Sequence, residues 1–467
     1  MSDFLPTGIQ LSYLVAASLF ILGLKKLGSP ATARKGNFVA AVGMLLAIIA
    51  TMLDQQVLNY EMILVGLAIG SVIGVVVAYK VQMTEIPQMV GLLNGLGGAS
   101  SALIAVAEFW RLLGSSQTIP FDVNISMLLD VLIGGVTLSG SFLAFAKLQG
   151  LVSGTPITFP FQGLFNLLLL GTYIAGSTYL IMSRDSLPIF LALVAVSLVL
   201  GVMFVLPIGG GDMPVVISLL NSLSGVAAGA AGFVVMNNML IIAGALVGAS
   251  GLILTEIMCK AMNRSLFSVL FSAFGSVSTA TGDAAAGASN QIVRSIDPEE
   301  GAMMLGYARS VVIVPGYGMA VAQAQHSVRE LADQLERMGV DVKYAIHPVA
   351  GRMPGHMNVL LAEANVAYTQ LYDMDDINPQ FEQADVALVI GANDVVNPAA
   401  RSDTNSPIYG MPILEVDRAR QTIVIKRGMS AGFAGVDNEL FYKDKTTMLF
   451  GSAKDMVAKL VAEVKQL

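Results

Sequence analysis

The sequence predicts a polytopic α-helical membrane domain of about nine spans, followed by a cytosolic α/β domain with a Rossmann-like parallel sheet. Nine long apolar runs precede residue 265. Only 13% of all residues are charged and the mean hydropathy is +0.70, whereas roughly 25% of a soluble domain is charged. In segment 310–321 a short apolar run ends at a glycine turn, as in nucleotide-binding domains.

The nine apolar runs are each predicted to be a transmembrane helix, because crossing a bilayer takes about 20 mostly apolar residues. We expect residues 1–264 to form the membrane domain, 265–294 a linker rich in small and polar residues, and 295–467 the α/β domain. The predicted spans lie near residues 9–24, 37–53, 61–79, 88–112, 124–147, 163–182, 188–207, 214–236 and 239–259.

Basic residues in the short loops predict the orientation of the chain. The loops after odd-numbered spans hold eight Lys or Arg residues, whereas the other loops and span ends hold Arg111 and Arg184. Because basic loops stay in the cytoplasm, we expect the N-terminus outside and the C-terminal domain inside. The net charge of −7 lies wholly after Arg264, where 16 basic and 23 acidic residues argue against a nucleic-acid surface.

Polar side chains inside the spans are the candidates for a path across the membrane. Asn94 and Asn221 are two of them, with structural hydrogen bonding as the alternative interpretation. Asp212 follows three glycines, which is typical of a hinge. All three histidines lie in the soluble part, so this chain offers no imidazole for a proton relay in the membrane. The other candidates are Asp130, Ser139, Ser141, Asn166, Ser222, Ser224 and Glu256.

Residues 295–467 alternate short apolar runs with helical stretches, which indicates a parallel sheet with crossover helices. Ligands of such sheets bind beyond the carboxyl ends of the strands, so the residues that follow each strand are candidate binding residues. Strands are predicted at 311–314, 340–345, 386–390, 413–415 and 422–425, and helices at 320–338, 356–364 and 455–464.

Three strand ends carry glycine, proline or amide residues. Residues 316–321 form a turn whose backbone amides suit a pyrophosphate, although Val321 departs from the G-x-G-x-x-G/A pattern. Residues 347–356 lack the acidic residue that binds the ribose of NAD, and they are either a phosphate contact or an ordinary loop. Asn393 and Asp394 either hydrogen-bond a carboxamide or ribose, or form a turn.

Two cations, Lys426 and Arg427, end the last predicted strand. They fit a 2′-phosphate, because Arg pairs with phosphate in a bidentate manner and Lys supplies a point charge. A solvated basic pair is the alternative. Together with the missing acidic residue, the pair favours NADP(H) over NAD(H) as the cofactor.

Longer segments around these motifs resemble one enzyme family. Over essentially its whole length the chain is similar to the β subunit of proton-translocating NAD(P) transhydrogenase, most specifically at 316–325, 347–363, 391–400 and 435–441. The resemblance implies reversible hydride transfer between NAD(H) and NADP(H) coupled to proton translocation. NADP(H) is then bound by this chain and NAD(H) by a separate α subunit. It further implies a dimer of αβ units among the lipids of the bacterial inner (plasma) membrane.

The resemblance also implies roles for single residues. Asp394 lies near the nicotinamide end, Lys426 and Arg427 bind the 2′-phosphate, and Asn94, Asn221 and Asp212 belong to the proton path or its coupling. No metal site is predicted. The implied cofactor-binding residues are Gly316, Tyr317, Gly318, Met319, Ala320, Val321, Val349, Ala350, Gly351, Arg352, Met353, Pro354, Gly391, Ala392, Asn393, Asp394, Val395, Gly410, Met411, Lys426, Arg427, Gly428, Met429, Ser430, Ala431, Gly432, Phe433, Ser452 and Ala453.

Two positions depart from the family pattern. Gly428 replaces the usual serine, which removes one hydroxyl contact to the 2′-phosphate. Asn94 stands where some members carry a histidine, which an α-subunit membrane helix can supply instead. The alternative function is an NADP(H)-gated membrane transporter or channel without hydride transfer, and a neighbouring reading frame for an NAD-binding α subunit would favour the enzyme.

Overall fold

The computed structural model describes the chain except for residues 1–3, 54–59, 82–84, 115–119, 154–155, 184–185, 210–211, 263–264, 272–292, 354, 405, 407 and 433. The chain divides into two compact units, Met1–Thr255 and Glu256–Leu467. Most of the predicted linker 265–294 lies outside the described residues, although the short helix α10 (Leu266–Phe271) falls within it. The domain boundaries drawn from the sequence stay predictions.

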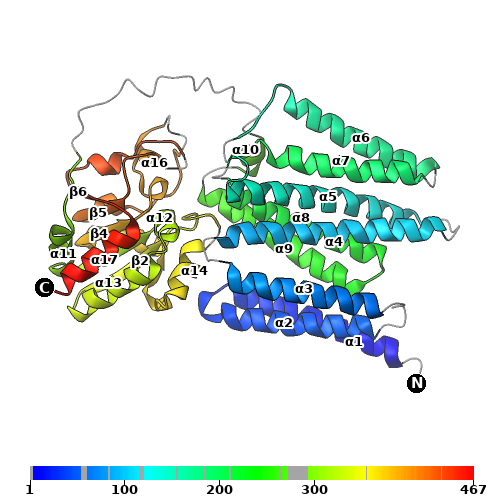
Figure 1. Ribbon diagram of the computed structural model, residues 1–467, viewed down its shortest axis with the longest axis horizontal. Coiled ribbons are helices and arrows are strands. Elements are labelled where there is room, and N and C mark those ends of the chain that lie inside the picture. Colours follow the sequence, from blue (N-terminus) through cyan, green and yellow to red (C-terminus); the bar gives the residue numbers. More distant parts are fainter. Residues whose placement is uncertain are drawn as a thin grey trace. The chain divides into compact units, whose positions relative to one another are not determined.

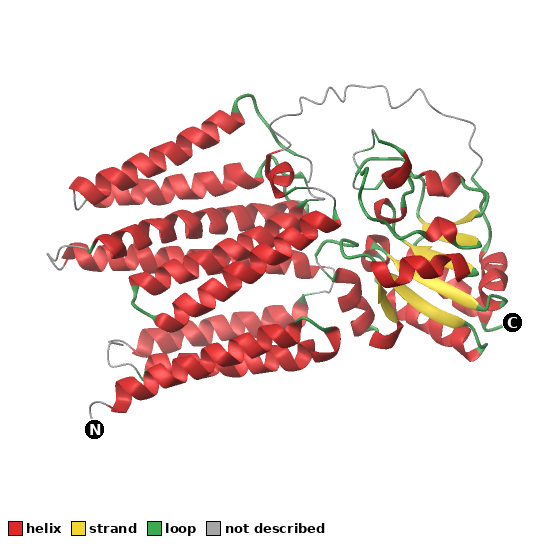
Figure 2. Ribbon diagram, turned by 180° about the vertical axis from the view of Figure 1, so that it is seen from behind, coloured by secondary structure: helices red, strands yellow, loops and turns green. Residues whose placement is uncertain are grey.

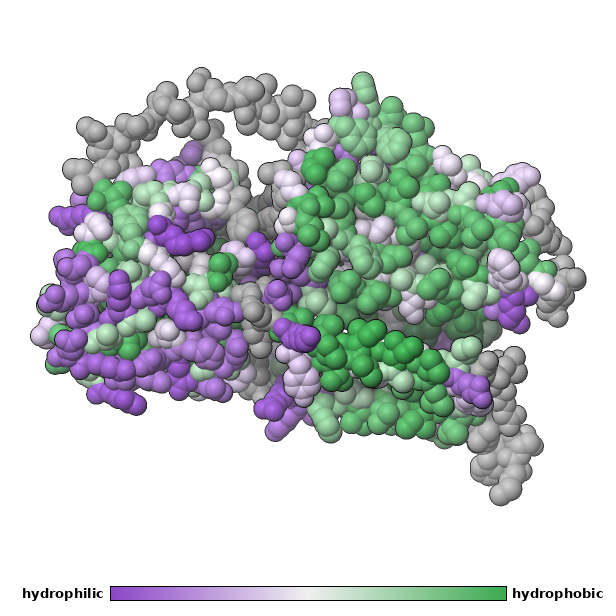
Figure 3. Space-filling model, viewed as in Figure 1, coloured by the Kyte–Doolittle hydropathy of each residue, from purple (hydrophilic) through white to green (hydrophobic). Residues whose placement is uncertain are grey.

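The first unit is a bundle of long helices (Figures 1 and 2). Within the described part of the chain, nine helices are long and apolar enough to cross a membrane, which confirms the nine predicted spans. The face of this bundle that Figure 3 shows is largely apolar. The helices are α1 (Phe4–Leu27), α2 (Pro30–Met52), α3 (Tyr60–Lys80), α4 (Ile86–Gly114), α5 (Phe121–Gln149), α6 (Gln162–Ser183), α7 (Leu187–Val205), α8 (Met213–Val234) and α9 (Asn238–Ala261).

Helices cross closely in this bundle where glycines face each other. A Cβ atom on Gly98 of α4 would lie 2.7 Å from the Gly134 carbonyl oxygen of α5. α8 and α9 meet in the same way, because a Cβ on Gly244 would lie 2.3 Å from Gly229 N. Apolar side chains gain little by leaving lipid for a helix interface, so close backbone packing of this kind holds membrane helices together.

The second unit contains a six-stranded parallel sheet with the order β3-β2-β1-β4-β5-β6. The order reverses between β1 and β4, which makes the fold Rossmann-like, as predicted. Helices α11, α13 and α17 pack together beside the sheet (Figure 1). The elements are α11 (Pro298–Gly306), β1 (Ser310–Pro315), α12 (Tyr317–Val321), α13 (Gln325–Arg337), β2 (Asp341–Ile346), α14 (His356–Glu363), β3 (Leu371–Asp373), α15 (Met374–Ile377), β4 (Val386–Ile390), α16 (Ala399–Ser402), β5 (Gln421–Lys426), β6 (Thr446–Phe450) and α17 (Ala453–Val464).

Some predicted elements of the sheet unit are wrong. Residues 413–415 form no strand, because Leu414 is buried in the core while its N–H bonds Val395 O outside the ladder. A short apolar run signals burial, and burial alone does not require a strand. The edge strands β3 and β6 are not among the predicted strands. The helix predicted at 320–338 is two helices, because Gln323 between α12 and α13 adopts a φ of +49°.

Candidate functional site

The loops after β1 and β4 touch where the strand order reverses. Gly316 N donates to Ile390 O and Gly318 N to Gly391 O, each at 2.9 Å. Gly391 has a φ of +67°, and a Cβ there would lie 2.4 Å from Gly318 Cα, so this position requires glycine. The glycine turn therefore joins two loops, and the amides of Gly316 and Gly318 are donated within the protein rather than facing a ligand.

Some of the other cofactor-binding residues predicted near this turn lie in the hydrophobic core, and the rest lie at the carboxyl edge of the sheet. Met319, Ala320 and Ala392 are buried. Val321, at the end of α12, is 47% exposed, and Val395 is half-buried. The buried members support the loops from below, so any contact with a ligand falls to the neighbouring residues of the edge.

The loop after β2 folds against Tyr317. The Arg352 guanidinium carbon lies 4.6 Å from the centre of the Tyr317 ring, and Arg352 N donates to His356 Nδ1 at 3.1 Å. Gly351 has a φ of +109°, and a Cβ there would lie 2.4 Å from the same Nδ1 atom. Burial, and the nearby Arg352 charge, lower the pKa of His356 to about 4. Pro354 lies outside the described residues.

The same loop is anchored from behind by His347, which is 1% exposed. Its Nδ1 accepts from Val349 N at 3.3 Å, and its Nε2 lies 2.9 Å from Pro412 O. These partners require a neutral ring protonated on Nε2. His347 therefore ties the predicted segment 349–354 to Gly410 and Met411, the two residues that precede Pro412.

Acid is expected to destabilise the second unit through His347. Burial lowers the pKa of this ring to about 4, with the hydrogen bond to Pro412 O acting in the opposite direction. The pKa of a histidine in the unfolded chain is about 6.5, so between about pH 6.5 and pH 4 the unfolded chain binds a proton that the folded chain does not. Stability is full above about pH 6.5 and falls towards pH 4, by roughly 2–4 kcal/mol.

This loss of stability is measured by unfolding the purified chain in urea at several pH values. Limited proteolysis monitors the unfolding of the second unit. His347→Gln should flatten the decline between pH 6.5 and 4, although His356 contributes in the same direction. His326→Gln is the matched control, because the side chain of His326 is 63% exposed. An unchanged pH slope in His347→Gln would contradict the interpretation.

Asp394, in the loop after β4, holds the segment Gly428–Ala434 that follows β5. Asp394 Oδ2 accepts from Ala434 N at 3.0 Å. A Cβ on Gly432 would lie 2.3 Å from Asp394 Oδ1, so this segment lies directly on the carboxylate. Phe433 lies outside the described residues. The Asp394 carboxylate thus lies against both Gly432 and Ala434 of this segment.

The side-chain amide of Asn393 has a defined orientation. Asn438 Oδ1 accepts from Leu440 N at 2.9 Å, so Asn438 Nδ2 is the donor that reaches Asn393 Oδ1, also at 2.9 Å. Asn393 Nδ2 is consequently a donor group, and no acceptor among the described residues reaches this buried atom. Buried amide groups are normally paired, so this N–H₂ group is suited to a ligand acceptor.

Lys426 and Arg427 lie at the carboxyl end of β5. Lys426 Nζ donates to Ser430 O and lies 5.3 Å from the centre of the Phe441 ring. Burial lowers the pKa of Lys426, while Asp394 and Asp437 oppose this effect. Arg427 is exposed, as are Ser430 and Ala431, and Met429 packs against the core of the sheet unit.

The end of β6 brings Ser452 and Ala453 beside these cations. Gly451 N donates to Lys426 O at 3.0 Å, and Ser452 then starts α17 as its N-cap residue. The first amides of a helix favour anions. Lys426, Arg427 and the N-terminus of α17 therefore lie at the same carboxyl edge of the sheet, and groups of these kinds suit a phosphate.

In the membrane unit, Asn94 and Asn221 belong to neighbouring helices. Asn94 is buried, and its Nδ2 donates to Ile217 O of α8 at 3.2 Å. Asn221 is half-buried one turn after Ile217 and therefore on the same face of α8. Asp212 precedes α8, about 14 Å along the axis from Asn221. The adjacent Gly210 and Gly211 of the predicted hinge lie outside the described residues.

Lys147 supports the same region, although the sequence indicated only a cytoplasmic loop charge. Its side chain is buried, and Nζ donates to Leu206 O at 2.6 Å and to Ile208 O at 2.8 Å. A cation is favoured at the C-terminal end of a helix, here α7. Lys147 thus fixes the segment between α7 and Asp212. The sequence feature that could have indicated this role is a lysine in the last turn of an apolar helix.

Comparison with known proteins identifies the family. The model of the NAD(P) transhydrogenase beta subunit family matches residues 9–463. Two proteins named NAD(P) transhydrogenase subunit beta, one from Rhodospirillum rubrum and one from a designated strain of that species, are similar to this chain. Each is 50% identical over 456 residues, which cover 96% of this chain and 97% of theirs. The chain, with its nine described apolar helices and its parallel-sheet unit, therefore belongs to the membrane-embedded NAD(P) transhydrogenase β subunit family.

Proposed function

We propose that this chain is the NADP(H)-binding, proton-conducting subunit of a transhydrogenase that couples reversible hydride transfer between NAD(H) and NADP(H) to proton translocation. The observation that carries the proposal is the carboxyl edge of the sheet, where Lys426, Arg427 and the N-terminus of α17 lie. The name of the two relatives supports the same reaction class.

The groups at this edge fit a phosphorylated dinucleotide. Lys426 and Arg427 would hold the 2′-phosphate, and Asn393 Nδ2 would donate to the carboxamide or a ribose oxygen. Arg352 and Tyr317 would lie against the cofactor. The bound nucleotide supplies the hydride, while the residues of the chain bind it, orient it and exclude water.

The NAD(H) site and the second nicotinamide belong, in this proposal, to an α subunit, and the complex is a dimer of αβ units. Residues 295–467 are the NADP(H)-binding domain, 265–294 the linker and 1–264 the proton-translocating domain. The chain lies in the bacterial inner membrane with its C-terminal domain in the cytoplasm. Asn94, Asn221 and Asp212 serve the proton path, and the contact between Asp394 and Gly428–Ala434 responds to the redox state of NADP(H).

Membranes that contain this chain and its α subunit test the proposal. We expect NADH to reduce an NADP analogue there, with an extent that changes when an uncoupler dissipates the proton gradient. Hydride transfer that has the same extent with and without the uncoupler would show that the reaction is not coupled to proton translocation. Proton flux that responds to NADPH without any hydride transfer would instead establish the gated channel.

Gly428→Ser is expected to tighten NADP(H) binding. No atom lies within 4 Å of a Cβ built on Gly428, so serine fits without displacing a neighbour. Its hydroxyl can add one hydrogen bond to the 2′-phosphate, worth about 0.5–1.5 kcal/mol, or up to roughly tenfold in affinity. Calorimetric titration with NADPH measures the gain, and Gly428→Ala separates the hydroxyl from the added Cβ. Equal affinities for the Gly428→Ser and Gly428→Ala proteins would place the 2′-phosphate elsewhere.

Asn221→Leu is expected to reduce coupled proton pumping while NADPH affinity stays unchanged. The substitution removes a polar group from the face of α8 that also carries Ile217, the partner of Asn94. A loss of about tenfold or more is expected if Asn221 orients a proton-carrying water. Dye quenching in vesicles reports pumping, and Asn221→Gln should retain part of it. Normal pumping in Asn221→Leu would assign Asn221 to helix packing.

A further inference from the structure

Asp130 lies deep in the membrane unit and is fully buried. It stands on α5 nine residues after Phe121, about 14 Å along the helix. No donor among the described residues reaches either carboxylate oxygen. A charge buried without a partner is strongly unfavourable, so such a carboxyl group points to a functional role rather than to a stabilising one.

The surroundings of Asp130 are apolar. Its α5 neighbours Met127, Leu128 and Val131 belong to one buried cluster with side chains from α4, α6 and α7. Phe109 of α4 stacks on Phe190 of α7 in that cluster, with ring centres 3.9 Å apart. Asp130 is therefore a single acidic group set into a hydrophobic core.

The buried tyrosine and the arginine near this core are engaged elsewhere. Tyr173 of α6 donates to Leu128 O at 2.7 Å, and Arg111 of α4 binds Glu108 at 2.5 and 2.8 Å. The described residues of α7 and α8 contain no ionisable side chain. The charge of Asp130 is thus not neutralised by a described cation, and a proton is the available counter-charge.

Two hydroxyl groups continue the face of α5 that carries Asp130. Thr137 and Ser141 follow by two and three turns, both are buried, and no described partner reaches either hydroxyl oxygen. A Cβ on Gly98 of α4 would lie 2.9 Å from Thr137 Cβ, and a Cβ on Gly91 would lie 3.6 Å from Ser141 O. The α4 segment between these glycines contains Asn94, so this face of α5 leads from Asp130 towards Asn94.

We propose that Asp130 is a proton-carrying residue of the translocation path, binding a proton as the neutral acid and releasing it towards the hydroxyls of Thr137 and Ser141. Asp130 and Thr137 lie seven residues, or about 10.5 Å, apart along α5, so the proton that leaves Asp130 crosses to the hydroxyls through intervening water molecules. Water and hydroxyl groups both donate and accept, so each can pass a proton on while it regains its own. The inference rests on the proposed proton-translocating function, and it adds a carboxyl group to a path otherwise composed of amides and hydroxyls.

Asp130→Asn tests the inference, because asparagine keeps the size of the side chain and cannot exchange a proton. The αβ complex is reconstituted in vesicles, and NADH-driven pumping is compared with NADPH affinity. We expect pumping to fall by about 100-fold with NADPH affinity unchanged, and Asp130→Glu to recover part of it. Asp122→Asn, exposed in the first turn of α5, is the matched control and should pump normally.

An infrared difference spectrum supplies a readout that packing alone would not move. The wild type should show a carboxylic-acid carbonyl band that changes between the NADP+ and NADPH states and is missing in Asp130→Asn. Normal pumping in Asp130→Asn overturns the inference and leaves the proposed function intact. A wild type that transfers hydride without moving protons overturns the proposed function itself.

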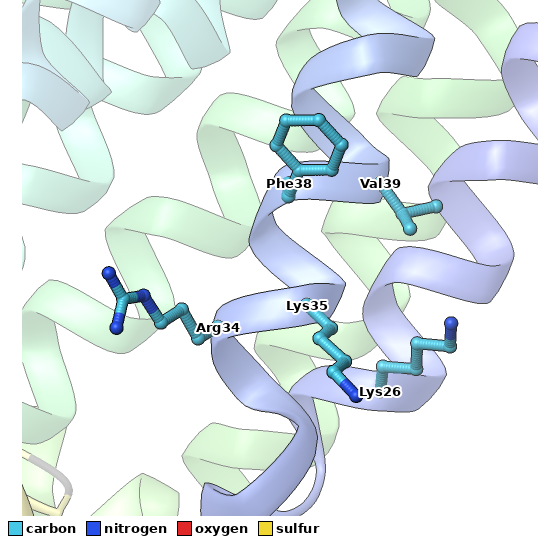
Figure 4. Close-up of a pocket in the computed structure, with 5 residues that line it drawn as sticks. All are labelled: Lys26, Arg34, Lys35, Phe38 and Val39. Atoms are coloured by element: carbon cyan, nitrogen blue, oxygen red, sulfur yellow. The ribbon is translucent and has the colours of Figure 1, made fainter.

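A second, independent observation concerns the connected ends of α1 and α2. A cavity of about 480 Å³ there is lined by Lys26, Arg34, Lys35, Phe38 and Val39. In Figure 4 Lys26 and Lys35 lie next to each other, while Arg34 extends to the other side of α2. The sequence from residue 4 to residue 52 contains no Asp or Glu, so the hairpin itself offers these cations no carboxylate.

We infer that this cavity binds the phosphate headgroup of an anionic phospholipid. Basic clusters at the end of membrane helices attract anionic lipids. Phe38 is 70% exposed beside the cations, which gives an acyl chain an apolar contact that free phosphate cannot use. The combination of cations and apolar surface therefore favours a lipid over a soluble anion.

Native mass spectrometry of the purified chain tests this site with phosphatidylglycerol, phosphatidylcholine and inorganic phosphate. We expect retention of phosphatidylglycerol alone, weakened about tenfold in Lys26→Gln/Lys35→Gln. Lys80→Gln/Lys260→Gln removes the same charge from the ends of α3 and α9 and should bind as the wild type does. Equal retention by both variants, or equal binding of phosphatidylcholine or of phosphate, overturns the inference.

Discussion

The purified chain by itself is expected to bind NADPH but to leave NADP+ unreduced by NADH. Within the described residues a single parallel sheet of the nucleotide-binding type is present. Hydride transfer requires the two nicotinamides about 3–3.5 Å apart, which a single site cannot provide. Addition of the α subunit, or of its soluble NAD-binding domain, should raise the rate from background to full turnover. Absorbance of an NADP analogue reports the reaction.

The control for this experiment is NADPH binding, which must be the same before and after addition of the α subunit if the chain is folded throughout. Mass spectrometry excludes contaminating α subunit from the preparation. Robust NADH-to-NADP+ transfer by the chain alone would refute the division of the two nucleotides between two subunits.

Lys426→Ala/Arg427→Ala is expected to weaken NADPH binding by about 3 kcal/mol or more, or at least roughly 100-fold, at 1.5–3 kcal/mol per charged hydrogen bond. NADH lacks the 2′-phosphate, so its weak binding should hardly change. Lys426 also donates to Ser430 O, which means that part of the loss reflects the position of the segment Gly428–Ala434. Arg427→Ala alone avoids this effect, because Arg427 is exposed.

Arg337→Ala/Lys459→Ala is the matched control, since both residues are exposed and the change in charge is the same. Isothermal titration with NADPH and NADH separates a local effect from a general electrostatic one. An equal loss of affinity for both nucleotides, or an equal loss of NADPH affinity in the control protein, would show that Lys426 and Arg427 do not bind the 2′-phosphate.

The membrane helices and the class of the second unit can be predicted from the amino-acid sequence alone. A bilayer requires about 20 apolar residues per helix, so nine runs of that length sufficed to predict nine helices. The strands β1, β4 and β5 contain buried apolar runs followed by glycine or by charge, and β2 ends in a buried run followed by His347 and Pro348. These local features were visible in the chain. The predicted site residues follow from the rule that ligands bind at the carboxyl ends of such strands.

Local signals did not reveal the edge strands or the irregular segment 413–415. β3 has three residues, which is too short for a periodic pattern, and β6 begins with Thr446 and Thr447. Ile413 and Leu414 are as apolar as the residues of a strand. The neighbouring strand β5, however, pairs with β4 on one side and with β6 on the other, so it offers this segment no ladder. Pairing is a property of the whole sheet.

The tertiary structure alone decided which groups are available for chemistry. The amides of Gly316 and Gly318 looked suited to phosphate, but Ile390 O at the end of β4 and Gly391 O directly after it accept both hydrogen bonds. Asn393 Nδ2 became a donor without a described acceptor because Asn438, 45 residues later, holds the other end of the amide. Asp130 lacks a described donor because its neighbours from three other helices are apolar or already paired. Hydrogen-bond satisfaction depends on contacts between residues distant in the chain, whereas helix length and strand burial are read from consecutive residues.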